Sequence, residues 1–159
     1  MNILVIEDSR FLRTAIERAL TKAGYVVTGV ADGEEGVHTA RAILPALILL
    51  DMMLPGLDGT CVLKSLKLDA STKQIPVIVL TGLSQRNEAK LRKAGAAAFI
   101  EKSSLDLGKN ADALIRAVEA ALGISSERLA ATTVQDPTPQ PEAPVIAAQA
   151  VLVRAESLP

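Results

Sequence analysis

The sequence is poor in cysteine and in aromatic residues. Cys61 is the single cysteine among 159 residues, so the chain cannot form an internal disulfide, and a zinc cluster is implausible. Tryptophan is absent, and two phenylalanines and one tyrosine are the only aromatic residues. This composition favours a protein of a reducing compartment, and we expect it to be cytoplasmic.

The sequence also lacks a strong net charge, a long apolar run and a leader peptide. Its formal net charge of −1 gives no reason to expect nucleic acid or an anionic membrane as a partner. No stretch approaches the roughly 18–20 uninterrupted apolar residues of a membrane span. The first ten residues, MNILVIEDSR, lack the basic segment of a signal peptide, and charges soon interrupt their apolar run. Hydrophobic residues nevertheless make up 49% of the chain, which fits a globular protein.

Apolar runs of strand length alternate with stretches of helical period. The helical stretches end at glycines or begin at aspartates: Gly24 follows the first, and Asp32 and Asp58 can cap the second and third. The predicted order is βαβαβαβαβα over the first 124 residues. The predicted strands are 3–6, 25–30, 46–50, 76–80 and 97–100, and the predicted helices are 9–23, 33–44, 59–68, 85–94 and 109–122.

Three of the five predicted strands, 3–6, 46–50 and 76–80, are apolar throughout rather than alternating. Strands of this kind are covered on both faces. Right-handed crossovers between them predict an α/β fold, with a parallel sheet between two layers of helices. Ligands bind such sheets at the carboxyl ends of the strands, so the residues just past each strand are the candidates for a site.

Polar residues follow four of the predicted strands. Glu7 and Asp8 come after the first, Asp51 after the third, Thr81 after the fourth and Lys102 after the fifth. Carboxylates that lie close together repel one another unless a cation is present, and oxygen ligands without histidine or cysteine suit Mg²⁺. A metal and an ammonium can neutralise a phosphoryl group, and an aspartate beside them can act as its nucleophile.

Each of these polar residues, taken alone, is most often a solvated loop residue. Together they follow different strands, and each has the chemistry that a phosphoryl-transfer site needs. The combination is therefore a far stronger signal than any of its members.

The motifs that contain these residues resemble those of bacterial response-regulator receiver domains. They are VIEDS around Glu7 and Asp8, LILLDMMLPGLDG around Asp51, VIVLTG around Thr81 and AAAFIEKS around Lys102. The resemblance extends over residues 1–124. It implies the doubly wound (βα)5, flavodoxin-like fold, a five-stranded parallel sheet in the order 2-1-3-4-5 with helices on both faces.

The resemblance implies a phosphoacceptor signalling module of a two-component system or phosphorelay. Asp51 would take a phosphoryl group from a histidine kinase or phosphotransfer protein. Mg²⁺ would be held by Glu7, Asp8, Asp51 and the backbone carbonyl of Met53.

The resemblance also assigns a switch and an output surface. Lys102 would contact the phosphoryl group, Thr81 would move toward it, and Phe99 would change rotamer together with Thr81. Residues 84–122 would then present an altered surface to a downstream protein. Phe99 has a second interpretation, because a lone aromatic residue on a strand can simply fill the core.

Two departures from the family pattern lead to further expectations. Ser103 follows Lys102 where family members usually have proline, so we expect a trans peptide bond and a shifted lysine, because a cis bond without proline costs about 3 kcal/mol. Met53 and Leu83 stand two residues beyond Asp51 and Thr81, where polar groups are common. Apolar side chains there should hinder water, so we expect a phospho-aspartate that hydrolyses slowly.

Two other functions remain as alternatives. A phosphatase of the haloacid-dehalogenase class also uses a strand-end aspartate, a threonine, a lysine and Mg²⁺, but it needs a second aspartate where this chain has Met53. A degenerate receiver would bind partners without phosphorylation, and Ser103 is its main support.

The basic residues of the fourth predicted helix, the single histidine and the single cysteine have simpler interpretations. Arg86, Lys90 and Lys93 make one face of the fourth helix basic, which is either a solvated face or a docking surface. His38 is expected to be exposed, and Cys61 to be a small buried residue of the third helix.

Residues beyond 124 differ in composition. Residues 125–144 end in DPTPQPEAP, which predicts an extended, proline-rich linker. Residues 145–159 are a short apolar tail, which we expect to dock on its own receiver or another, so that a homodimer is one candidate assembly; the start of a truncated domain is the alternative. Four acidic residues against two basic ones do not favour a DNA-binding arm, and 35 residues leave no room for an output domain.

Overall fold

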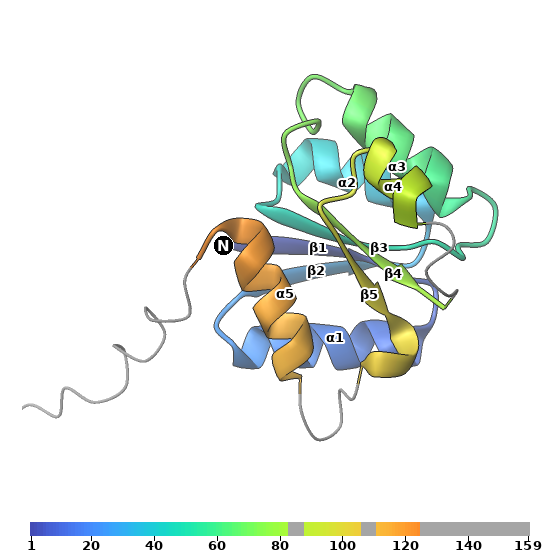
Figure 1. The fold of residues 1–159 in the computed structure, drawn as a ribbon. Helices are drawn as coiled ribbons and strands as arrows, with labels where there is room; N and C mark the ends of the chain where they lie inside the picture. The colour runs from blue at the N-terminus through green and yellow to red at the C-terminus, as the bar shows by residue number, and fades with distance from the viewer. Residues whose placement is uncertain (83–87, 106–110, 125–159) are drawn as a thin grey trace, which may run out of the picture.

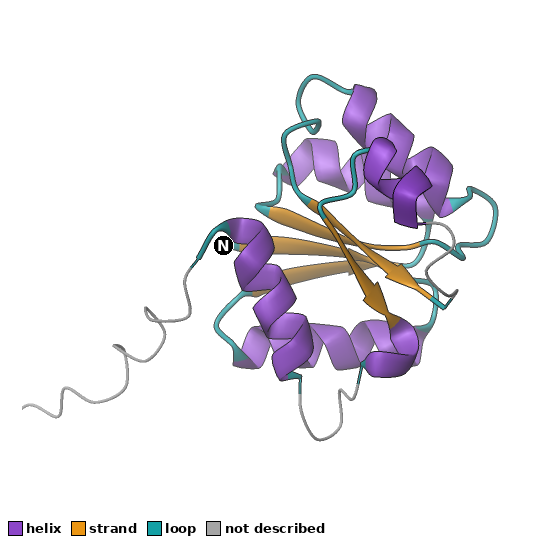
Figure 2. Cartoon of the chain, in the orientation of Figure 1, coloured by secondary structure: helices purple, strands orange, loops and turns teal. Residues whose placement is uncertain are grey.

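The computed structural model describes residues 1–82, 88–105 and 111–124. Within these ranges five strands alternate with five helices, in the predicted order (Figures 1 and 2). The strands are β1 Asn2–Ile6, β2 Val26–Val30, β3 Leu47–Asp51, β4 Val77–Thr81 and β5 Ala98–Glu101. The helices are α1 Arg10–Lys22, α2 Gly33–Ile43, α3 Gly59–Leu68, α4 Glu88–Lys93 and α5 Asp112–Leu122, and a short 3-10 turn covers Lys102–Ser104.

The strands form one parallel sheet in the order β2-β1-β3-β4-β5, which confirms the predicted topology. Helices α2, α3 and α4 cover one face, and α1 and α5 cover the other (Figure 1). β3 is buried along its whole length and β1 and β4 along most of theirs, as their continuous apolar sequences predict.

The sheet separates two apolar clusters. One lies between the sheet and α2, α3 and α4, and the other lies between the sheet and α1 and α5. Since successive side chains of a strand point to opposite faces, Leu4 and Ile6 belong to the first cluster, and Ile3 and Val5 to the second.

The helix boundaries follow from local hydrogen bonds. Asp32 Oδ1 accepts from the amides of Glu34 and Glu35 at 2.7 and 3.1 Å, so it caps α2 as predicted. Asp58 Oδ1 accepts from the amide of Thr60 at 3.2 Å and caps α3. Gly24, which follows α1, has φ +90°, the left-handed conformation that glycine adopts freely.

One of the sequence predictions about single side chains is wrong. Cys61 lies on the exposed side of α3, whereas we expected it to be buried. Val62, Leu63 and Leu66 supply the buried face of that helix. His38 is exposed, as expected. None of the described helices is long and apolar enough to cross a membrane. The linker and tail, Leu83 and Arg86 lie outside the described residues.

Candidate functional site

Three carboxylates meet at the carboxyl edge of the sheet. Ile6 pairs with Leu50, so Glu7 and Asp51, the next residue of each chain segment, emerge side by side from β1 and β3. Both are fully buried, whereas Asp8 is exposed. Each of the three offers a carboxylate oxygen within 4.8 Å of the others. Adjacent strands thus concentrate negative charge at one point.

Lys102 brings a positive charge to the same place. Its Nζ lies 2.8 Å from Asp51 Oδ2, 2.9 Å from Glu7 Oε2 and 3.1 Å from Glu7 Oε1. Burial of the ammonium lowers the pKa of Lys102, but its bonds to Asp51 and Glu7 outweigh this and the net pKa is raised. The pKa of Glu7 is also raised, because burial and then the nearby Asp51 charge outweigh the contact with Lys102.

The Lys102–Ser103 peptide bond is trans, as expected in the absence of proline; the described residues contain no cis bond. The lysine nevertheless reaches Glu7 and Asp51. The 3-10 turn that starts at Lys102 is closed by Ser104, whose Oγ donates to the Glu101 carbonyl at 2.7 Å. This turn directs the lysine stem toward the carboxyl edge of the sheet.

Asp51 is held in place by the chain that follows it. The amide of Met53 donates to Asp51 Oδ1 at 3.0 Å. At the start of α3, Gly59 packs so closely that a Cβ atom would lie 2.6 Å from the Asp51 carbonyl oxygen and from Met52 Cα. Only glycine fits there, because the opposing atoms are backbone and cannot yield. Gly59 thereby allows α3 to begin directly against the end of β3.

The donor set fits a hard divalent cation. Glu7 Oε2 and Asp51 Oδ2 are buried and receive no hydrogen bond of ordinary geometry from the described residues, although both lie within 2.9 Å of Lys102 Nζ. Two buried anions facing one ammonium leave negative charge uncompensated, and the exposed Asp8 opens the cluster to solvent. Oxygen donors of this type, accessible on one side, suit Mg²⁺, which retains several waters.

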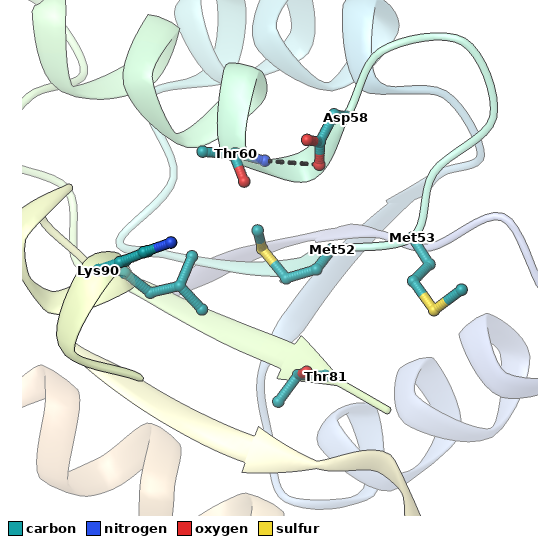
Figure 3. Close-up of a pocket in the computed structure, with 7 residues that line it drawn as sticks. Met52, Met53, Asp58, Thr60, Thr81 and Lys90 are labelled. Carbon is teal, nitrogen blue, oxygen red and sulfur yellow. Dashed lines mark hydrogen bonds between the residues drawn. The ribbon is translucent and has the colours of Figure 1, made fainter. Parts of the chain in front are cut away.

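Thr81 ends β4 and lines a pocket of about 290 Å³, whose lining also includes Met52 and Met53, the two residues that follow Asp51. Met52 and Met53 lie between Thr81 and the start of α3, and Lys90 reaches toward the pocket from α4 (Figure 3). Met53 is 65% exposed, so it borders the opening rather than the core. The pocket beside Thr81 is thus lined by both apolar and polar side chains, and the expected slow hydrolysis beside Met53 stays a prediction.

Phe99 lies two residues before the end of β5 and pairs with Val79 in the neighbouring strand. It is half-buried and packs against the cluster under α2, α3 and α4. The guanidinium of Arg92, on α4, lies 5.1 Å from the centre of its ring, within the range of a cation–π interaction. Phe99 therefore both fills core space and contacts α4.

Sequence reasoning missed one residue that contacts the acidic pair. Arg13 Nη1 donates to the backbone carbonyls of Glu7 and Asp8 at 2.7 and 3.4 Å. The available signal was an arginine on the first turn of the helix that follows the two acids. Periodicity marks such a residue only as polar, so the contact could not be predicted.

Similar proteins place the chain in a family. A sequence model described as the response regulator receiver domain matches residues 3–115. AfsQ1, a transcriptional regulatory protein of Streptomyces coelicolor, is 38% identical over 118 residues, which are 74% of this chain and 50% of that protein. PleD, a response regulator of Caulobacter vibrioides, is 38% identical over 63% of this chain and 22% of its own length. The chain spans half or less of the length of the first curated relatives that it matches.

Solved structures agree with this relationship. The receiver domain of the sensor histidine kinase PA1611 from Pseudomonas aeruginosa, which has a magnesium ion coordinated in its active-site cleft, is 29% identical, with a TM-score of 0.68. The alignment covers 77% of this chain and 97% of that one. The receiver domain of the Francisella response regulator 1452 is 27% identical, also with a TM-score of 0.68, over 77% of this chain and 96% of its own. With its strand order, its strand-end carboxylates and its lysine, this chain belongs to the response regulator receiver domain family of two-component signalling.

Proposed function

We propose that Asp51 is the phosphoacceptor of this receiver. A carboxylate oxygen of Asp51 attacks the phosphorus of a phosphohistidine on a kinase or phosphotransfer protein. The phosphorus–nitrogen bond breaks, the imidazole leaves with the electron pair, and an acyl phosphate forms on Asp51. The observation that carries this proposal is the position of Asp51, buried at the edge of the sheet, with Lys102 2.8 Å from Oδ2 and the Met53 amide on Oδ1.

Glu7, Asp8, Asp51 and the backbone carbonyl of Met53 are the groups that would hold Mg²⁺. The ion, when bound, neutralises charge on the transferred phosphoryl group and on the attacking carboxylate. The uncompensated charge of Glu7 and Asp51 supports this assignment.

Lys102 and Thr81 complete the phosphoryl site. The Lys102 ammonium, already beside Asp51 Oδ2, pairs with a phosphoryl oxygen once Asp51 carries the group. The Thr81 hydroxyl moves to hydrogen-bond another phosphoryl oxygen, and Phe99 changes rotamer with it. Because Phe99 contacts Arg92, this change alters the surface of α4, β5 and α5. That surface binds a downstream protein.

The proposal also covers the domain organisation and the partners of the chain. The chain acts as a cytoplasmic signalling module, with a receiver over residues 1–124, a linker over 125–144 and a docking tail over 145–159. Its partners are a histidine kinase or phosphotransfer protein and a downstream protein. A second copy of the chain is a further candidate partner. It is not an enzyme that acts on other substrates.

Two alternatives have specific weaknesses. A haloacid-dehalogenase phosphatase needs an acid–base group two residues after its nucleophile, and the thioether of Met53 cannot exchange a proton. A degenerate receiver would have lost the site, but here Lys102 contacts both Glu7 and Asp51 although Ser103 replaces proline.

Incubation with a small acyl phosphate, with Mg²⁺ or with EDTA, separates these functions. The proposal predicts one covalent phosphoryl group per chain, dependent on Mg²⁺ and absent from Asp51→Asn. Sustained hydrolysis of a phosphoester, without a stable phosphoprotein, would favour the phosphatase. A chain that accepts no phosphoryl group from any small donor or kinase would be a degenerate receiver.

A further inference from the structure

Arg13 contacts the candidate site through the backbone of its acidic residues. It lies on the first turn of α1, and its guanidinium points toward the end of β1 rather than into solvent; its side chain is 19% exposed. Nη1 lies 2.7 Å from the Glu7 carbonyl oxygen and 3.4 Å from the Asp8 carbonyl oxygen. Through these two hydrogen bonds Arg13 contacts the backbone of Glu7 and Asp8 and not their carboxylates.

With these bonds, the amide, the side chain and the carbonyl of Glu7 each have a hydrogen-bond partner. Its amide donates to the Val30 carbonyl of the neighbouring strand at 3.1 Å, and its Oε1 accepts from the Ser9 amide at 3.2 Å. The Glu7 carbonyl lies past the last residue of β1, where strand pairing no longer provides a partner. Arg13 supplies that partner, and a charged donor makes the bond stronger than a neutral one would be.

The sheet leaves room for the arginine at Gly29. A Cβ atom on this residue of β2 would lie 3.0 Å from Arg13 Cδ and would collide with the carboxylate of Glu17. Glu17 Oε1 lies 4.0 Å from Arg13 Nε. A glycine within a strand often marks such a close approach. The arginine is therefore packed from β2 and from its own helix.

We propose that Arg13 is a positioning residue for the cation site. By fixing the carbonyls of Glu7 and Asp8, it fixes the peptide plane between them and hence the directions in which the two carboxylates leave the chain. The effect should be greatest for Asp8, whose exposed side chain is otherwise free to take other rotamers. This inference rests on the proposed Mg²⁺ site, and it explains why the acidic pair is followed by an arginine on α1.

The test compares Arg13→Gln and Arg13→Lys with Arg18→Gln in the full chain. Arg18 is an exposed residue of the same helix, so Arg18→Gln removes the same charge without touching the acidic pair. Mg²⁺ alone is titrated, and the dissociation constant is read from the amide NMR signals of Asp8, Ser9 and Asp51. Removal of groups that orient metal ligands costs about 10–100-fold in metal affinity, and we expect about tenfold for Arg13→Gln, because Arg13 acts through the backbone. Arg13→Lys keeps the charge but not the planar fork, so its loss should be smaller.

A second measurement distinguishes positioning from mere stabilisation. The rate of phosphorylation by a small acyl phosphate is measured against Mg²⁺ concentration. We expect Arg13→Gln to raise the half-saturating Mg²⁺ concentration about tenfold and to leave the rate at saturating Mg²⁺ within about twofold of the parent. The melting temperature in EDTA reports the effect on the fold separately.

Each outcome decides the matter. If Arg13→Gln binds Mg²⁺ as Arg18→Gln does, or if only its melting temperature falls, then Arg13 is a structural residue and the inference is wrong. If Arg13→Gln does not fold, the same two results for Arg13→Lys carry the decision. If the parent chain itself binds no Mg²⁺, the proposed function fails, and this result is distinct from a failure of the role of Arg13.

Discussion

Replacing Lys102 with methionine should destabilise the protein in the absence of metal and strengthen its binding of Mg²⁺. Glu7 and Asp51 are buried, with side chains 0% and 1% exposed, and Lys102 is the cation that contacts them both. Removal of one partner from a buried ion pair costs about 3–5 kcal/mol. The Lys102 side chain is 24% exposed, so water can replace part of what it provides, and we expect a loss of about 2–3 kcal/mol at neutral pH.

Urea unfolding in EDTA and in saturating Mg²⁺ measures this effect. In EDTA the free energy of unfolding should fall by the amount given above. In Mg²⁺ most of that loss should be recovered, because the ion binds the folded state in place of the ammonium. Lys64→Met, which removes an exposed lysine of α3, is the charge-matched control and should change stability little in either condition.

A double-mutant cycle with Asp51→Asn tests the cause. Asparagine removes one of the two buried charges, so Lys102→Met should cost at least about 1 kcal/mol less in that background. Equal costs of Lys102→Met in both backgrounds would refute the reasoning that the lysine compensates these carboxylates. A loss in EDTA that Mg²⁺ does not reverse would equally contradict the idea that the ion can compensate the charge of these carboxylates when the ammonium is absent.

Three other substitutions probe the surroundings of Asp51 and the rest of the fold. Met53→Asn should accelerate hydrolysis of the phospho-aspartate about tenfold, equivalent to 1.4 kcal/mol in the barrier, because an amide beside the opening can orient water; an unchanged half-life of the phosphoprotein would contradict this. Gly59→Ala should cost about 1–3 kcal/mol in urea unfolding, because its methyl group meets backbone atoms at 2.6 Å, whereas the exposed Gly82→Ala serves as the control. The pKa of Asp69 lies below its ordinary value of 3.8, chiefly because of its hydrogen bonds from the Ser71 hydroxyl and amide and then because of Arg41. The stability that ionised Asp69 contributes is therefore present above about pH 3.8 and is lost as the pH falls through the lower pKa of the folded state. Asp69→Asn should make acid unfolding less steep in that pH window.

The features predicted well from the sequence are those that depend on local pattern and on general rules of topology. The apolar run that ends at Asp51 predicted a buried central strand, because only a strand covered on both faces tolerates it. The capping roles of Asp32 and Asp58 were readable, because a cap needs only neighbouring amides. Parallel pairing then brings Glu7 and Asp51 together without further information.

The features that sequence reasoning missed depend on contacts between distant segments or on the reach of long side chains. The exposed position of Cys61 was missed because its helix buries Val62, Leu63 and Leu66 instead, and small shifts of a helical face decide single positions. The bonds of Arg13 to the acidic pair depend on the space at Gly29, a residue of another strand.

The claim that Asp51 is the phosphoacceptor is tested most directly by identifying the residue that carries the phosphoryl group. The full chain is incubated with a small acyl phosphate and Mg²⁺, treated with borohydride to reduce any aspartyl phosphate to homoserine, and digested for mass spectrometry. We expect homoserine at position 51 in the parent chain, and none there when Mg²⁺ is omitted or when Asp51 is replaced by asparagine. Homoserine at Asp8 or at another carboxylate, or an unmodified Asp51 in a chain shown to be folded and to bind Mg²⁺, would contradict it.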